Sequence, residues 1–276
     1  MTNNEATEVS GDIEADCGRL HVEATGKGPA VVLLHGGSAD SRMWQGQLAA
    51  LTGHYRVIRY DLRGLGQSPP PAAPYRMSDD LTAVLDHQGV DSAALVGFST
   101  GGTIALEFAA RYPARAAALV LIGAIVPAEP GQIPGYEAAR QELTLQLAPR
   151  EAARARGDLA AAVAADLDVW ASAQHGAARA ELAAWGMVNP YFHADMGEHE
   201  QLGPVSDAAV AAIAAPTLVM VGDQDTGLSR LCADYLADTI PGAQLQVFAD
   251  ADHFVSTARP AAFNKALRSF LDNVML

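Results

Sequence analysis

The sequence is poor in cysteine and has no long hydrophobic runs, and both shortages exclude whole classes of protein. Its two cysteines, Cys17 and Cys232, lie far apart in the chain. They are too few for a disulfide framework, a zinc site or a redox Cys-x-x-Cys pair. No stretch approaches the ~20 apolar residues of a transmembrane helix, and the polar, acidic residues 1–5 lack the features of a signal peptide. We therefore expect a cytoplasmic protein with no membrane association.

Positive charge is also scarce. The chain has 18 basic residues against 32 acidic ones, which gives a formal net charge of −14. Because such a chain repels phosphate groups, we expect no nucleic-acid partner. Half of the 276 residues are hydrophobic, so the chain is long enough and apolar enough to bury one sizeable α/β core.

What the chain does contain is a regular alternation of short apolar runs and amphipathic segments. The apolar runs cover residues 30–34, 55–60, 116–122, 216–222 and 243–248, with a further run that ends at Val96. This alternation predicts an α/β fold with a mostly parallel sheet of about eight strands, flanked by helices. In such a sheet, functional groups gather at the carboxyl ends of the strands.

The alternation stops between residues 127 and 206. This stretch is rich in alanine, has leucines at helical spacing and shows no strand pattern. We predict a helical cap over 127–206, inserted between the two parts of the core at 12–126 and 207–276. Residues 1–11 are polar, and we expect them to form a disordered tail.

The pentapeptide at 97–101, Gly-Phe-Ser-Thr-Gly, fits the pattern Gly-x-Ser-x-Gly and joins an apolar run to an amphipathic segment. A serine hydroxyl becomes a useful nucleophile when it is exposed, next to a base and close to oxyanion donors. A tight turn between strand and helix meets these needs, because the helix start adds backbone N–H groups. Glycine is common in this chain, so the pentapeptide alone is weak evidence for a nucleophile at Ser99.

An acid and a histidine follow later strands in the order expected of a serine hydrolase with this topology. Asp225 comes after the run at 216–222, and His253 comes after the run at 243–248. A histidine can take the serine proton, and a carboxylate can orient that histidine. Asp223, Asp250 and Asp252 are alternative candidates for the acid.

Taken together, five segments in this order resemble the motifs of the α/β-hydrolase family. They are residues 33–37, 60–68, 95–102, 216–225 and 252–254. The resemblance covers nearly the whole chain and implies a catalytic triad of Ser99, Asp225 and His253. The family spacing Gly-x-x-Asp, counted from Gly222, favours Asp225 as the acid.

The same resemblance implies an oxyanion hole made by the backbone N–H groups of Gly37 and Thr100. A serine nucleophile excludes the branches that use aspartate, such as epoxide hydrolases and haloalkane dehalogenases. We expect a serine hydrolase of a small carboxylic ester or lactone that needs neither a metal nor a cofactor. The alternatives are a carbon–carbon bond hydrolase, an enol-lactonase, a haloperoxidase or perhydrolase relative, and a ligand-binding receptor on the same scaffold.

Four apolar side chains are candidates for the substrate pocket, although ordinary core packing explains each of them equally well. They are Trp44, Trp170, Trp185 and Met187. We further predict that Asp61 and Arg63 form an internal ion pair and that His35 fixes the oxyanion loop. The expected partner is an apolar ester or lactone, and a homodimer is the assembly to test.

Overall fold

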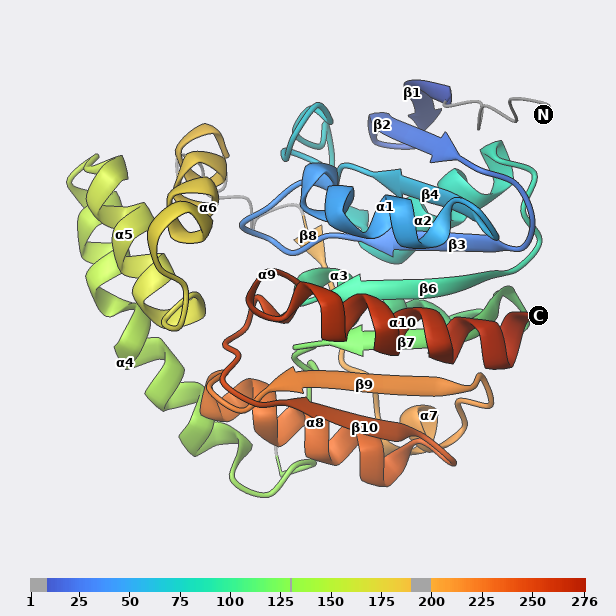
Figure 1. Cartoon of the computed structure of the whole chain (residues 1–276). Coiled ribbons are helices and arrows are strands. Elements are labelled where there is room, and N and C mark those ends of the chain that lie inside the picture. Colours follow the sequence, from blue (N-terminus) through green and yellow to red (C-terminus); the bar gives the residue numbers. More distant parts are fainter. Residues whose placement is uncertain (1–8, 130, 190–199) are drawn as a thin grey trace.

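One eight-stranded sheet runs through the computed structural model (Figure 1), which describes residues 9–129, 131–189 and 200–276. The order across the sheet is β1 (Val9–Ala15), β2 (Gly18–Thr25), β4 (Arg56–Tyr60), β3 (Ala30–Leu34), β6 (Ala93–Phe98), β7 (Ala116–Ile122), β9 (Thr217–Gly222) and β10 (Gln244–Phe248). β2 pairs antiparallel with both β1 and β4, and every other neighbouring pair is parallel. The predicted mostly parallel sheet is confirmed.

The first strand begins earlier than the sequence pattern predicts. Residues 9–11, expected in the disordered tail, lie in β1, where Val9 pairs with Ala24 and Gly11 pairs with Val22. Only Ile13 of this strand is buried, so β1 shows no clear apolar alternation. Its backbone pairing with β2 defines the strand, and the prediction of a tail is wrong for residues 9–11. Residues 1–8 of the predicted tail lie outside the described residues.

Helices cover both faces of the sheet and divide the core into two layers. α2 (Met77–His87), α3 (Thr100–Arg111) and α8 (Gly227–Thr239) pack on one face, and α1 (Gln45–Leu51) and α10 (Pro260–Met275) pack on the other. Along β3, Val32 and Leu34 join the first layer while Val31 and Leu33 join the second. Because both faces are covered, the central strands are continuous apolar runs. The shorter elements are η1 (Ser41–Trp44), β5 (Tyr75–Arg76), η2 (Pro113–Arg115), α7 (Asp207–Ala211) and α9 (Val255–Ala258).

Three helices follow β7 and lie beyond the carboxyl ends of the parallel strands, on the left of Figure 1. They are α4 (Tyr136–Ala155), α5 (Leu159–Trp170) and α6 (Gly176–Val188). The stretch also contains β8 (Glu200–Gln201), which pairs with β5 and was not predicted. Residues 130 and 190–199 of the predicted cap lie outside the described residues.

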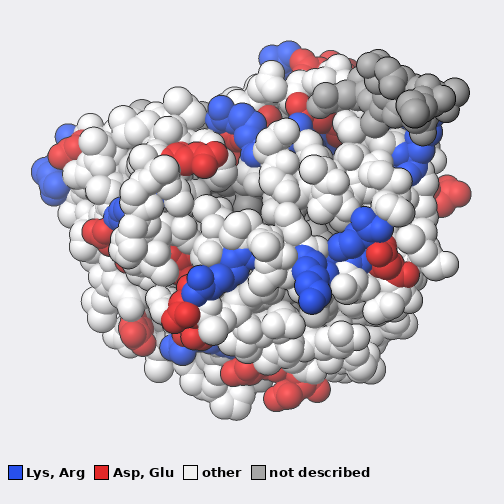
Figure 2. Space-filling model, viewed as in Figure 1, with Lys and Arg blue, Asp and Glu red and all other residues white. Residues whose placement is uncertain are grey.

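The surface carries charges of both signs. On the face shown in Figure 2, Lys and Arg side chains lie among Asp and Glu side chains, with no continuous basic stripe in the part of the chain that is described. No helix within the described ranges is long and apolar enough to cross a membrane. The absence of a nucleic-acid partner remains a prediction.

The two cysteines lie in different environments, which gives a direct test of the fold. Cys232 is buried in α8, and burial raises the pKa of its thiol to about 11. Cys17 is half-buried in the turn between β1 and β2. Because the thiolate is the reactive form, we expect a disulfide reagent at pH 8 to modify only Cys17 in the native protein and both thiols after denaturation. Rapid modification of two thiols in the native protein would contradict the burial of Cys232.

Candidate active site

Ser99 lies in the turn between β6 and α3, as its motif predicts. Its backbone has φ +52° and ψ −118°, a conformation that residues other than glycine rarely adopt. Two backbone hydrogen bonds hold it there: the Ser99 N–H donates to the Ile122 carbonyl at 2.8 Å, and the Thr103 N–H donates to the Ser99 carbonyl at 3.0 Å. The strained turn is thus tied to β7 on one side and to the first turn of α3 on the other.

The glycines of the motif are required by close packing of the backbone. A Cβ atom on Gly97 would overlap the Gly101 carbonyl, and a Cβ atom on Gly101 would overlap the Leu34 carbonyl at the end of β3. These contacts bring the turn against the neighbouring strand. They explain why a larger residue does not fit at either position.

His253 and Asp225 form a buried pair after the last two strands of the sheet. The distance from His253 Nδ1 to Asp225 Oδ2 is 2.8 Å, and Asp225 Oδ1 accepts a hydrogen bond from the Thr226 N–H at 2.6 Å. The imidazole also contacts Phe98 and Trp170, with ring centroids 4.8 and 4.5 Å away. Since Nδ1 faces the carboxylate, Nε2 is the ring nitrogen on the side away from Asp225.

Two of the alternative acids are exposed and have other partners than His253. Asp223 is exposed and accepts a hydrogen bond from the backbone of the loop after β10. Asp250 is exposed and pairs with Arg259 at 2.9 Å. Of the four candidate carboxylates, Asp225 alone has a hydrogen bond to His253 within the described residues.

The third alternative, Asp252, is buried and joins the loop of His253 to the loop between α5 and α6. Its carboxylate accepts hydrogen bonds from the Ala173 N–H, the Gln174 side chain and the Phe254 N–H, each at 3.0 Å. Ala173 and Gln174 belong to the loop between α5 and α6. Asp252 therefore fixes the loop of His253 against this loop.

A cavity of about 170 Å³ lies between the core and the helices α4 and α5, and it brings most of the predicted residues together. Its lining residues are Gly37, Ser38, Phe98, Ser99, Thr100, Ile125, Leu147, Arg150, Asp166, Trp170 and His253. Ser99, His253 and the two predicted oxyanion residues thus share one cavity. Asp225 lies behind the imidazole of His253 and does not line the cavity.

His35 holds the loop that carries Gly37. Its Nε2 accepts a hydrogen bond from the Leu62 N–H at 2.9 Å, and its Nδ1 lies 2.8 Å from the Gly36 carbonyl. Burial lowers the pKa of His35, so the ring stays neutral and can accept at one nitrogen and donate at the other. This arrangement fits the prediction that His35 fixes the oxyanion loop.

The predicted ion pair between Asp61 and Arg63 is wrong. Arg63 pairs instead with Asp80 in α2 at 2.6 Å. Asp61 accepts hydrogen bonds from the backbone N–H groups of Ser41 and Gln67, both at 2.8 Å. Proximity in sequence suggested the wrong partner, because the turn after β4 directs the two side chains to different neighbours.

The predicted pocket residues divide into two groups. Trp170 lines the cavity of about 170 Å³ that contains Ser99 and His253, called the catalytic cavity below after its predicted role. Trp185 lines a small cavity that adjoins it. Trp44 is fully buried in the core layer with α1 and α10, away from the cavity, and Met187 is 42% exposed. The prediction is therefore wrong for Trp44, which the short helix η1 turns toward the sheet. It is also wrong for Met187, which α6 directs toward solvent.

Sequence reasoning missed two charged residues of the cavity, Arg150 in α4 and Asp166 in α5. Arg150 Nη1 donates to Asp166 Oδ1 at 2.8 Å. Burial raises the pKa of the Asp166 carboxyl, and the hydrogen bond from Arg150 opposes this shift. No motif surrounds either residue in the Ala-rich segment, so the packing of α4 on α5 was needed to find them.

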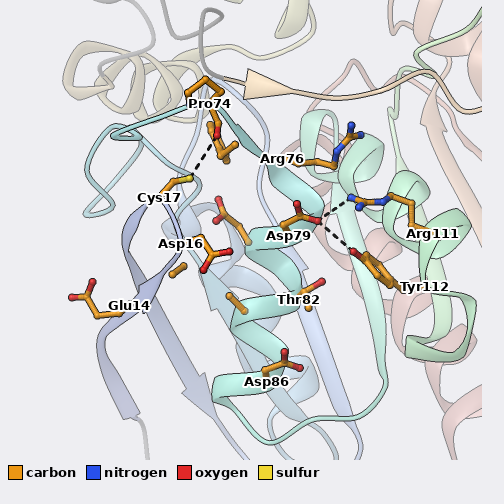
Figure 3. A pocket seen from close by; sticks show the side chains of 14 residues that line it. Glu14, Asp16, Cys17, Pro74, Arg76, Asp79, Thr82, Asp86, Arg111 and Tyr112 are labelled. Atoms are coloured by element: carbon orange, nitrogen blue, oxygen red, sulfur yellow. Dashed lines mark hydrogen bonds and ion pairs between the residues drawn. The ribbon is translucent and has the colours of Figure 1, made fainter.

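A larger cleft of about 690 Å³ lies elsewhere, between the β1–β2 turn and helices α2 and α3 (Figure 3). It shares no lining residue with the catalytic cavity and contains neither serine nor histidine. Within it, Asp79 pairs with Arg111 at 2.9 Å and accepts a hydrogen bond from the Tyr112 hydroxyl. The cleft with the larger volume is therefore not the one that contains the predicted site residues.

Comparison with known proteins assigns this chain to a family. A family model described as "alpha/beta hydrolase fold" matches residues 29–259. The chain belongs to the α/β-hydrolase family, a family of hydrolytic enzymes.

The chain is 32% identical over 267 residues to the proposed carbamate hydrolase RutD of Variovorax paradoxus (strain S110), and the match covers 92% of this chain and 97% of that protein. Two solved structures are also similar. One is Est816, described as an N-acyl homoserine lactone degrading enzyme, with 30% identity, a TM-score of 0.74 and coverage of 94% of this chain and 100% of that chain. The other is a malate-bound thermophilic esterase from Thermogutta terrifontis, with 28% identity, a TM-score of 0.76 and coverage of 98% and 100%.

Proposed function

We propose that this protein is a serine hydrolase of small carboxylic esters or lactones that works through an acyl-enzyme on Ser99. The observation that carries the proposal is the buried pair of His253 and Asp225, 2.8 Å apart, with His253 lining the same cavity as Ser99. A nucleophile in a strained turn, a base, and a carboxylate that orients the base are the parts that acyl transfer needs.

In the proposed reaction, His253 Nε2 takes the proton of Ser99 as the serine oxygen attacks the carbonyl carbon. The backbone N–H groups of Gly37 and Thr100 stabilise the oxyanion, and Asp225 stabilises the imidazolium. The proton then passes to the departing alcohol oxygen and leaves an acyl group on Ser99. Water attacks this ester, His253 takes a proton from the water and returns one to Ser99, and the acid is released.

The walls of the cavity support a small substrate with an apolar part. Phe98, Ile125, Leu147 and Trp170 contribute apolar surface to a cavity of about 170 Å³, and such a surface favours an apolar acyl or alcohol group. The named relatives include an esterase, an enzyme that degrades an acylated lactone and a proposed carbamate hydrolase. A carbonyl bonded to oxygen or nitrogen is the feature common to these substrates. The mechanism requires no metal or cofactor.

Labelling with a fluorophosphonate tests the proposal directly. We expect the wild type to gain one label, which peptide mapping places on Ser99, and Ser99→Ala to gain none. Ser38→Ala is the matched control, because Ser38 lines the same cavity but lies outside the turn between β6 and α3 that carries Ser99. We expect this variant to gain the same label as the wild type. A folded wild type that stays unlabelled would favour a ligand-binding protein on the hydrolase scaffold.

A rate screen then separates the remaining chemistries. It compares p-nitrophenyl esters of increasing chain length, lactones and a vinylogous 1,5-diketone, with peracid formation from hydrogen peroxide as a further assay. Fastest turnover of an ester or lactone supports the proposal. Fastest turnover of the diketone would replace it with carbon–carbon bond hydrolysis, and dominant peracid formation would replace it with perhydrolysis.

A further inference from the structure

Two charged side chains of the cap, Arg150 and Asp166, line the catalytic cavity, and the proposed mechanism uses neither. Their side chains are only 11% and 3% exposed, and they lie 2.8 Å apart. A buried ion pair adds little to stability, because the cost of removing both charges from water offsets their attraction. Its position in the cavity wall points instead to contact with the substrate.

Two carboxylates already balance the charge of Arg150, which disfavours a carboxylate on the substrate. Arg150 Nε and Nη2 lie 2.8 and 2.7 Å from Glu151 Oε1, and its Nη1 lies 2.8 Å from Asp166 Oδ1. Each guanidinium nitrogen therefore already contacts a carboxylate, and two carboxylates face one guanidinium. An anionic group on a substrate would be repelled by the excess negative charge.

Asp166, by contrast, offers hydrogen-bond acceptors to the cavity. A carboxylate has about four acceptor sites. Arg150 donates to Oδ1 and the Trp170 side chain also donates to this carboxylate, which leaves about two acceptor sites for a ligand. Asp166 lines both the catalytic cavity and the adjoining one, which also contacts Ser38 and Trp185. The catalytic cavity is small, so a donor group next to a carbonyl at Ser99 lies close to this carboxylate.

We propose that Asp166, held in place by Arg150, selects esters and lactones that carry an uncharged hydrogen-bond donor, an amide N–H or a hydroxyl, beside the scissile carbonyl. This specificity rests on the proposed function. We infer an uncharged donor because Phe98, Ile125 and Leu147 give the cavity apolar walls. An ammonium group would lose its hydration between these walls. A substrate without the donor covers the remaining acceptor sites of the Asp166 carboxylate without satisfying them, which lowers the kcat/KM of that substrate.

Three p-nitrophenyl esters of nearly equal size test this specificity. The N-acetylglycine ester carries an amide N–H, the levulinic ester has CH₂ in place of that N–H, and the succinic ester ends in a carboxylate. We expect the wild type to prefer the N-acetylglycine ester over the levulinic ester by about tenfold or more in kcat/KM. The succinic ester should be the poorest of the three.

The decisive variant removes both charges together, because a single replacement would leave the other charge buried without its partner. In Arg150→Met/Asp166→Leu we expect the preference to fall to about onefold, measured as the ratio of the kcat/KM values of the two neutral esters and independent of their absolute rates. The matched control is Glu137→Leu/Arg140→Met, which removes an exposed ion pair from α4, the helix that carries Arg150. This control should keep the wild-type preference.

Each result has one interpretation. Equal rates for the two neutral esters in the wild type, or a preference that survives in the double variant, would overturn the role of Asp166 and leave the proposed function intact. Preference for the succinic ester would make Arg150 an anion site and overturn the specificity. Hydrolysis of none of the three esters, together with an unlabelled Ser99, would overturn the proposed function itself.

Discussion

Replacing Asp225 with Asn is expected to lower kcat/KM for a p-nitrophenyl ester about 10⁴-fold. The Asp225 carboxylate holds the Nδ1 side of His253 at 2.8 Å, and an amide can present its NH₂ group there, which favours the wrong tautomer of the ring. The ring would then keep its hydrogen on Nε2, where it cannot accept the proton of Ser99. Both side chains are buried, so water does not easily take the place of the lost interaction.

Asp223→Asn is the matched control for this prediction, since Asp223 lies two residues earlier in the same loop and is exposed. Its activity should stay within about threefold of the wild type, because surface changes usually have small effects. Steady-state kinetics on both variants, with circular dichroism to confirm folding, make the comparison. An inactive Asp223→Asn beside an active Asp225→Asn would show that the acid is assigned to the wrong residue.

Gly123→Ala is expected to reduce kcat about 100-fold or more. Gly123 follows β7 with φ +55°, and a Cβ atom there would lie 2.7 Å from His253 Cε1 and 2.8 Å from His253 Nδ1. The imidazole would have to move, and a displacement of about 1 Å at a catalytic group is enough for a loss of this size. The positive φ also strains alanine, which should lower the free energy of unfolding by about 1–3 kcal/mol.

Gly89→Ala separates these two effects. Gly89 has φ +63°, but a Cβ atom there meets nothing within 4 Å. We expect Gly89→Ala to lose a similar amount of stability and to keep its kcat, as measured by urea unfolding and ester kinetics. Equal loss of kcat in both variants would show that strain or partial unfolding, and not contact with His253, explains the effect of Gly123→Ala.

The sequence by itself determined the central strands of the sheet and the order of Ser99, Asp225 and His253 along the chain. The strands at 30–34 and 116–122 have the bounds that their apolar runs predict, because a strand covered on both faces must be apolar throughout. The turn at Ser99 was predictable for a similar reason, since the crowding of backbone around Gly97 and Gly101 depends on residues close to the turn or on the adjacent strand. Local sterics and side-chain periodicity are properties that a sequence shows directly.

Only the tertiary structure decided which side chains meet. Four aspartates follow the strands β9 and β10, and of these four Asp225 alone is hydrogen-bonded to His253. Asp252 accepts a hydrogen bond from Gln174 in the loop between α5 and α6 instead. The same holds for Arg150 and Asp166, which become neighbours through the packing of α4 on α5. Family spacing favoured Asp225 among the four, but no spacing pointed to the other contacts, because they depend on how elements distant in sequence are oriented in three dimensions.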